Sequence, residues 1–164
     1  MSRKFNKALY KKNINEMTSN ELSKFYQLTT KRLTLKEYQG SNEDLLWIKN
    51  EIKSQWAILS NKTDIRYTGR VDPGLMAVMG YRVGDTNGIN CEHRRMIIMD
   101  VIAGPLPLVG DYLYIQWWGQ DGSAERVEAM KSWLKHKIDS PQHKNHYRAQ
   151  NEWKADLFWV ESTF

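Results

Sequence analysis

The chain has 164 residues, of which 41% are apolar and 26% are charged, and its formal net charge is +5. This length fits one domain with a buried core, and the composition excludes an intrinsically disordered chain. No stretch approaches the roughly 18 to 20 apolar residues of a membrane span, the basic N-terminus lacks the apolar run of a secretory signal, and the single cysteine excludes an intramolecular disulfide framework. We therefore expect a protein of the reducing cytoplasm that folds without a partner and does not cross a membrane.

The positive charge is concentrated in residues 1 to 13, which contain five cations and no acidic residue, whereas the rest of the chain has nineteen basic and nineteen acidic residues. The five cations are Arg3, Lys4, Lys7, Lys11 and Lys12. Such a basic arm can track the phosphates of a nucleic acid, and five neutralised phosphates predict a salt slope of about 4 to 5. The alternative is a solvated, frayed terminus. A short pattern in which Phe5, Ala8, Leu9 and Lys12 share one face also allows a helix here.

The first clear helix signal is Thr18 followed by Glu21, the spacing of a capping box, which predicts a helix that starts near Asn20. The same spacing recurs at residues 34 to 37. The chain therefore either breaks near Leu33 or continues as a short second helix through Tyr38, before Gly40 ends it.

The clearest helix follows Ser41, and acidic residues in its first turn complement the helix dipole. Its inward stripe, at steps of three and four residues, consists of Leu45, Ile48, Ile52, Trp56 and Leu59. The stripe lasts about two heptads, which favours a core helix over a coiled coil. Residues 61 to 72 are rich in turn formers and predict a connector between an N-terminal helical subdomain (14–60) and a C-terminal one (73–164).

In the C-terminal part, Pro73 suits the first turn of a short helix that runs to about Met79. Asn90 can cap the next helix, which Gly104 ends. Residues 106 to 120 are ambiguous, because their aromatic and β-branched content suits a strand and their length suits a short helix, which we favour.

Ser123 predicts the start of a further helix, and a last helix begins at about Tyr147. Their inward stripes are Val127, Met130, Leu134 and Ile138 in the first helix, and Trp153, Leu157 and Val160 in the second. The sequence therefore predicts an all-α fold, mainly a helical bundle of about six to seven helices, with a short β or irregular segment at 106 to 118 as the alternative there.

Two arginines, Arg94 and Arg95, lead into the most apolar run of the chain. On a wheel of about 100° per residue, Arg94 falls in the middle of the apolar arc and Arg95 at its rim. The apolar arc is formed by Cys91, Ile97, Ile98, Val101 and Ile102, and the opposite face by Glu92, His93, Met96, Met99 and Asp100. We expect Arg94 to point inward.

A buried guanidinium needs anionic or carbonyl partners. In the structural interpretation, Arg94 clamps Asp111, Asp121 or Glu125, or carbonyl groups of the neighbouring glycine-rich turns. In the functional interpretation it faces a cleft and binds a phosphate or carboxylate from outside. We favour the structural interpretation.

Two familiar motifs are weaker matches in this region. The spacing of Gly80, Gly84 and Gly88 is superficially that of a phosphate-binding loop, but no strand of adequate length precedes it, so a tight turn is the better interpretation. A short helix, a turn and a second helix outline a helix-turn-helix. Its base-reading side chains must be exposed, however, whereas the wheel turns Arg94 inward.

No catalytic or metal site emerges from the sequence. The metal-ligand candidates Cys91, His93, His143 and His146 lie on separate segments, and the first two point about 200° apart on a helix. Cys91 on an apolar face is expected to behave as a small hydrophobic residue. The acid pairs are Glu125 with Glu128 and Glu152 with Asp156, and we interpret them as solvated helix surface. We predict no cofactor and no enzymatic activity.

A set of short motifs in the C-terminal half resembles a C-terminal segment of uncharacterised bacterial proteins. The motifs are Gly80-Tyr81-Arg82-Val83-Gly84, Arg94-Arg95, Leu106-Pro107, Trp118-Gly119, Ser123-x-x-Arg126, and Trp153 with Asp156 and Leu157. The resemblance covers residues 75 to 160 and leaves the first sixty residues unmatched. It implies a phage, satellite or defence setting and no particular chemistry.

Three functional hypotheses follow, of which the least favoured is an enzyme with a dispersed site. The first is a nucleic-acid-binding accessory protein that uses the basic arm, with Arg82, Arg94 and Arg95 as further phosphate contacts. Under this hypothesis, deletion of residues 1 to 13 abolishes retention of nucleic acid and leaves the thermal melt almost unchanged. The alternative is a protein-interaction module, an inhibitor or assembly factor, with exposed tryptophans at its interface: Trp117, Trp118 and Trp159.

Overall fold

The computed structural model describes residues 5–35, 41–62, 74–108 and 117–164. These residues form α-helices and one short 3-10 helix and contain no strand, which confirms the predicted all-α fold. In chain order the elements are α1 (Lys7–Glu16), α2 (Ser19–Leu33), α3 (Asn42–Lys62), α4 (Leu75–Val78), α5 (Cys91–Ala103), α7 (Ala124–Asp139), η1 (Pro141–His143) and α8 (Tyr147–Thr163).

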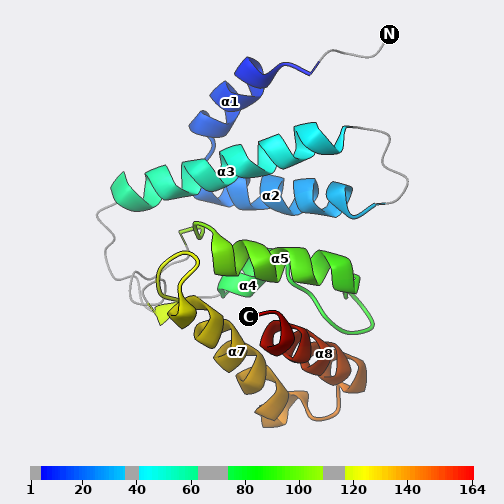
Figure 1. Ribbon diagram of the computed structural model, residues 1–164. Helices are drawn as coiled ribbons and strands as arrows, with labels where there is room; N and C mark the ends of the chain where they lie inside the picture. Colours follow the sequence, from blue (N-terminus) through cyan, green and yellow to red (C-terminus); the bar gives the residue numbers. More distant parts are fainter. Residues whose placement is uncertain (1–4, 36–40, 63–73, 109–116) are drawn as a thin grey trace.

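The helices are arranged in three layers (Figure 1). The first layer consists of α2 and α3, with α1 packed on α3. The middle layer contains α5, which follows α4, and the third layer is the hairpin of α7 and α8. One continuous apolar cluster runs through all three layers, from Ile14 and Leu22 through Ile97 and Val101 to Val160.

Side-chain caps fix several helix starts where the sequence predicted them. Thr18 and Glu21 form a complete capping box at the start of α2. The Ser41 hydroxyl accepts from the N–H of the third residue of α3 at 3.3 Å. Asn90 caps α5 and Ser123 caps α7 in the same way. Each cap satisfies an N–H that the helix itself leaves without a partner.

Three boundary predictions have mixed outcomes. Helix α2 ends at Leu33, where a break in the helix was one of the two predicted alternatives. The other alternative was a short second helix through Tyr38, and residues 36 to 40 lie outside the described residues. Helix α3 extends to Lys62 and so includes the start of the predicted connector. The remaining part of that connector and most of the ambiguous segment at 106 to 118 also lie outside the described residues.

The prediction that α5 buries one face only is wrong. His93 and Asp100, placed on the polar face, are buried, whereas Cys91, placed on the apolar face, is exposed. The reason is that α5 contacts α2 on one side and both α7 and α8 on the other. A helix in the middle layer must bury two opposite faces, and a one-sided wheel cannot describe it.

Candidate nucleic-acid interface

The segment expected to be a basic arm is a docked helix from Lys7 onward. One side of α1 lies along α3, and each step of four residues on α1 is matched by a step of four on α3. Lys7 Nζ lies 5.6 Å from the centre of the Trp47 ring, Lys11 Nζ lies 3.6 Å from a Glu51 carboxylate oxygen, and the Asn15 carbonyl accepts from the Gln55 amide at 3.4 Å.

Apolar contacts hold this docked helix in place. Ile14 is fully buried in the core cluster, and the Phe5 ring packs on Tyr10 and Trp47, with ring centres 4.8 Å and 5.8 Å apart. Deletion of residues 1 to 13 removes the Phe5 contacts and most of α1. We therefore expect this deletion to lower the thermal melt, in contrast to the prediction from the sequence, and the charges are better tested by substitution.

The lysines of α1 remain accessible in this arrangement. The side chain of Lys11 is 60% exposed despite its ion pair with Glu51, and Lys12 is exposed. Lys7 borders a concavity of about 530 Å³ that also includes Asp44. Arg3 and Lys4 lie outside the described residues.

Arg94 points inward, as predicted, and it is a structural clamp. Its Nε donates to Asp156 Oδ2 at 2.7 Å and its Nη2 to Asp156 Oδ1 at 3.4 Å, while Nη1 donates to the Ile89 carbonyl at 2.8 Å. The Tyr81 hydroxyl also donates to Asp156. Burial opposes the charge of Arg94, but the hydrogen bond and charge of Asp156, reinforced by Glu152, raise its pKa above the ordinary value. Arg94 is only 4% exposed and is held by these partners, so it does not face solvent as a phosphate contact would.

The carboxylate partner of Arg94 was predicted incorrectly. The bond to the Ile89 carbonyl fits the expectation that Arg94 binds carbonyl groups of the neighbouring glycine-rich turn. Asp121 instead binds Arg126, Glu125 is exposed, and Asp111 lies outside the described residues. The actual partner, Asp156, is fully buried, so its interpretation as solvated helix surface is also wrong.

Arg126 is the loop-stapling arginine that sequence reasoning missed. Its guanidinium donates to the carbonyls of Val101, Gly104 and Gly119, at 2.6 to 3.2 Å, and to the carboxylate of Asp121 at 2.9 Å. Burial lowers the pKa of Arg126, and Asp121 opposes that shift. The sequence signal that could have indicated this role is the position of Arg126 in the first turn of the helix capped by Ser123, directly after the turn that contains Gly119 and Gly122.

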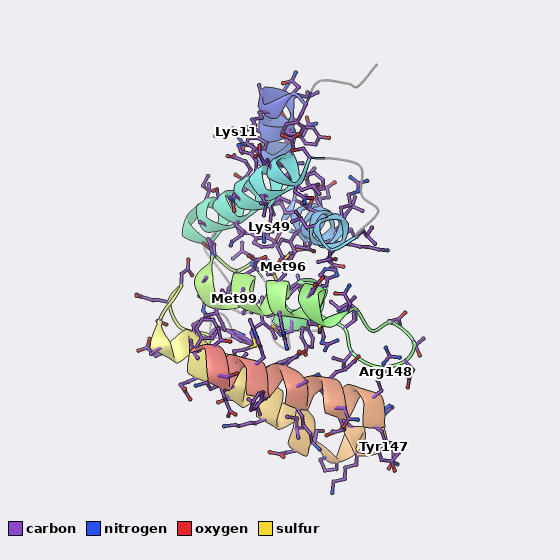
Figure 2. The ribbon with its side chains drawn as sticks, turned by 45° about the vertical axis from the view of Figure 1, so that its right-hand side comes forward. Lys11, Lys49, Met96, Met99, Tyr147 and Arg148 are labelled. Atoms are coloured by element: carbon purple, nitrogen blue, oxygen red, sulfur yellow. The ribbon has the colours of Figure 1, made fainter. Side chains whose placement is uncertain are left out.

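A second buried cluster joins α5 to the first layer. Asp100 of α5 accepts from the Tyr26 hydroxyl at 2.6 Å and pairs with Lys49 Nζ at 3.0 Å and Lys53 Nζ at 3.1 Å. Figure 2 shows Lys49 between α3 and α5. Burial, followed by the charge and hydrogen bond of Asp100, raises the pKa of Tyr26 well above its ordinary value. Helix α5 is thus joined by buried charges to the layers on both of its sides.

The other two predicted arginine contacts lie apart from α1. The guanidinium of Arg95 is half-buried 5.3 Å from the centre of the Trp159 ring. Arg82 is exposed in the loop between α4 and α5, and its Nη1 donates to the carbonyls of Ala77 and Tyr81. Because α5 is covered on two sides, it lacks the broad exposed face with which a recognition helix enters a DNA groove, and this argues against the helix-turn-helix hypothesis.

Only one of the seven tryptophans is exposed. Trp117 is 52% exposed, Trp159 is half-buried, and Trp118 is fully buried. Trp118 therefore does not belong to an exposed interaction surface. Two aromatic residues on α8 are more exposed than Trp117: Tyr147 is 76% exposed and Phe158 is 73% exposed.

The described residues contain no group of three or more His, Cys, Asp or Glu side chains arranged to hold a metal ion. Within the same ranges, no helix combines the length and the apolar character that a membrane span requires.

Comparison with known proteins adds no family assignment, because no protein-family model, no curated protein and no solved structure matches the chain. The class that the fold and the candidate site define is thus a small all-α protein with a basic N-terminal helix. The resemblance of residues 75 to 160 to a segment of uncharacterised bacterial proteins stays a prediction.

Proposed function

We propose that the protein is a small non-enzymatic accessory protein that binds nucleic acid through the cations of its first thirteen residues, in the setting of a mobile element, a phage or a defence system. The observation that carries the proposal is the charge distribution: the whole surplus of five positive charges lies in this segment, while the remainder is balanced. Lysines and arginines that neutralise phosphates provide most of the affinity of sequence-independent binding.

The geometry of α1 supports this function. Because α1 is docked on α3, its lysines project from a fixed helix, and less conformational entropy is lost on binding than with a disordered arm. The pair between Lys11 and Glu51 is long and solvent-exposed on the lysine side, so it is weak and Lys11 can exchange it for a phosphate. Arg94 and Arg95 are not part of this interface.

The test compares two variants that each lose five positive charges. In the first, Arg3, Lys4, Lys7, Lys11 and Lys12 are replaced by glutamine. In the matched control, glutamine replaces Lys24, Lys31, Lys131, Lys135 and Lys154, which lie on α2, α7 and α8. Both have a formal net charge of zero, so a difference between them depends on where the charge lies.

Binding of labelled duplex and single-stranded oligonucleotides is measured by fluorescence anisotropy at low salt. The proposal predicts that the N-terminal variant loses at least about 100-fold in affinity and that the control loses much less. Equal losses in both variants mean that only net charge matters, and the interface is then not at the N-terminus. No binding by the wild-type protein contradicts the proposal outright.

A second candidate function is a protein-interaction module, and the exposure of Trp117 favours it. Aromatic residues dominate binding energy at protein interfaces, and solvent-exposed tryptophans are uncommon on a monomer. The test is the capture of a partner from the native host with each variant. A partner that no longer binds the Trp117→Ser variant but still binds the N-terminal glutamine variant favours this alternative. The reverse pattern favours the nucleic-acid function.

A further inference from the structure

A small, mostly apolar concavity lies where α2 of the first layer meets α5 and the loop that precedes it (Figure 1). Its volume is about 330 Å³, at the lower end of the range of small-molecule sites. Three stretches of chain line it: the second half of α2, the loop that follows α4, and the first turn of α5. Convergence of separate segments on one concavity is typical of a ligand site.

Hydrogen bonds hold the walls of this concavity in place. The side-chain amide of Gln27 donates to the Val78 carbonyl at 2.7 Å. This bond keeps the Gln27 side chain against Gly80, where an added Cβ would lie 2.8 Å from Gln27 Cγ. In the loop, the N–H of Ile89 donates to the Arg82 carbonyl at 3.2 Å. The walls therefore exist before a ligand arrives, which lowers the free-energy cost of binding.

His93 of α5 is the buried polar residue of the lining, and the structure fixes where its hydrogen lies. It is 7% exposed, and burial, followed by the charge of Lys31, lowers its pKa, so the ring is neutral near neutral pH. Its Nε2 lies 3.2 Å from the Thr30 hydroxyl. That hydroxyl has one hydrogen and donates it to the carbonyls of Tyr26 and Gln27 at 3.0 and 3.1 Å. It therefore accepts from His93, and the ring hydrogen is on Nε2.

The other ring nitrogen of His93, Nδ1, is thus a hydrogen-bond acceptor, and no described residue donates to it. It is also not sealed inside the protein. In the described part of the chain, the side-chain nitrogens that are both unpaired and shut off from solvent belong to Arg95 and three tryptophans. Because His93 lines the concavity, Nδ1 meets solvent there and can accept from a ligand.

The remaining described residues of the lining provide apolar surface and positive charge. Leu28 is 43% exposed and Ile89 is half-buried, and both present apolar side chains. The charged residues among them are Lys31 and Arg82, both exposed, and no acidic residue of the described ranges lines the concavity. Arg82 uses Nη1 for two carbonyls of its own loop, so Lys31 is the cation that is more available to a ligand. An anion that enters here meets no competing carboxylate.

From this combination of an unpaired acceptor, apolar walls and positive charge, we propose that the concavity binds a small aromatic carboxylate that carries a hydroxyl group. The hydroxyl donates to Nδ1 of His93, the aromatic ring packs on Leu28 and Ile89, and the carboxylate faces Lys31. A ligand that lacks the hydroxyl or the carboxylate leaves one of these groups without a partner and binds more weakly. None of the N-terminal cations lines the concavity, so this site goes beyond the proposed nucleic-acid function.

The first test observes the two ring nitrogens of His93 by NMR near neutral pH, assigned by comparison with the His93→Phe variant. The free protein is expected to have its hydrogen on Nε2 and a lone pair on Nδ1. Saturation with meta- or para-hydroxybenzoate is expected to move the Nδ1 resonance to lower frequency, as happens when a ring nitrogen accepts a hydrogen bond, whereas benzoate leaves it in place. A hydrogen on Nδ1 in the free protein, or no response to either hydroxybenzoate, overturns the inference.

The second test compares the affinities of the two hydroxybenzoates, benzoate and phenol. At least one hydroxybenzoate is expected to bind about three- to tenfold more tightly than benzoate, the range of a single hydrogen bond, and phenol is expected to bind more weakly than that hydroxybenzoate because it lacks the charge. In His93→Phe the advantage of the hydroxybenzoate over benzoate is expected to disappear. Equal affinities of all four compounds, or an advantage that persists in His93→Phe, contradict the proposal.

A matched pair of lysine variants tests the charge contact. Lys31→Gln removes the cation of the lining, and Lys24→Gln removes an exposed cation from the same helix outside the lining. The first is expected to bind the hydroxybenzoate at least about threefold more weakly than the second, with no difference between them for phenol. Equal affinities of the two variants for the hydroxybenzoate overturn the inference. The N-terminal glutamine variant keeps the whole lining and is expected to bind the hydroxybenzoate like the wild type, so failure of either proposal is visible without the other.

Discussion

The buried pair of Arg94 and Asp156 provides a sharp test of how the layers are held together. The Asp156 side chain is fully buried and that of Arg94 is 5% exposed, and two hydrogen bonds join them. Removal of one partner from a buried pair leaves the other charge without compensation, which costs about 3–5 kcal/mol. For a chain of this size that is a large part of the whole free energy of unfolding, about 5–15 kcal/mol.

The perturbation is a double-mutant cycle of Arg94→Met, Asp156→Asn and the combined variant. Asparagine keeps the shape of the site and an oxygen that can accept from the Tyr81 hydroxyl. Each single variant is expected to lose about 3–5 kcal/mol, because each leaves a buried charge unpaired. The combined variant removes both charges, so its loss is expected to be close to that of one single variant rather than to the sum.

The assay is urea unfolding followed by tryptophan fluorescence, with the slope m compared between variants. A loss of 3–5 kcal/mol also lowers Tm by roughly 6–20 °C in a protein of this length. Single losses below about 1 kcal/mol, or additive losses in the combined variant, refute the conclusion that this pair clamps α5 to α8.

Three further predictions concern buried polar groups and a tight turn. Burial, with a neighbouring carboxylate, raises the pKa of Tyr26 and of Tyr81. Their contribution to the free energy of unfolding is therefore complete below about pH 10 and is lost as the pH rises further. Absorbance titration of tyrosinate is expected to show two residues that ionise only when the protein unfolds. Burial, with a neighbouring lysine, lowers the pKa of His93. Its contribution to the free energy of unfolding is therefore complete above about pH 6.5 and is lost as the pH falls. This part of the acid destabilisation is expected to disappear in His93→Gln, and the same dependence of stability on pH in the variant and the wild type contradicts the prediction. A methyl group at Gly88 collides with the Gly84 carbonyl oxygen, so Gly88→Ala is expected to cost at the upper end of about 1–3 kcal/mol in urea unfolding, and a neutral effect contradicts the turn geometry.

Local signals were the part of the fold that could be predicted from sequence. Thr18, Ser41, Asn90 and Ser123 cap their helices as expected, because a cap depends only on the three residues that follow it. The all-α class follows from the same signals and from apolar stripes with helical spacing.

Partners distant in sequence could not be predicted in the same way. Arg94 was correctly expected to be buried, but its carboxylate partner is 62 positions away, on a helix where neighbouring lysines gave the impression of a solvated surface. The burial of Asp100 was missed for a related reason, because α5 has layers on both sides and a wheel assumes one buried face.

The salt dependence of nucleic-acid binding tests the central functional claim most directly. For duplex DNA, the logarithm of the association constant of the wild-type protein is expected to fall with the logarithm of salt concentration with a slope of about −4 to −5, since each neutralised phosphate contributes about 0.9. The N-terminal glutamine variant is expected to have a slope near zero, and the matched control is expected to keep the slope of the wild type. A slope that is the same in the N-terminal variant as in the wild type contradicts the claim that residues 1 to 13 contact the phosphates.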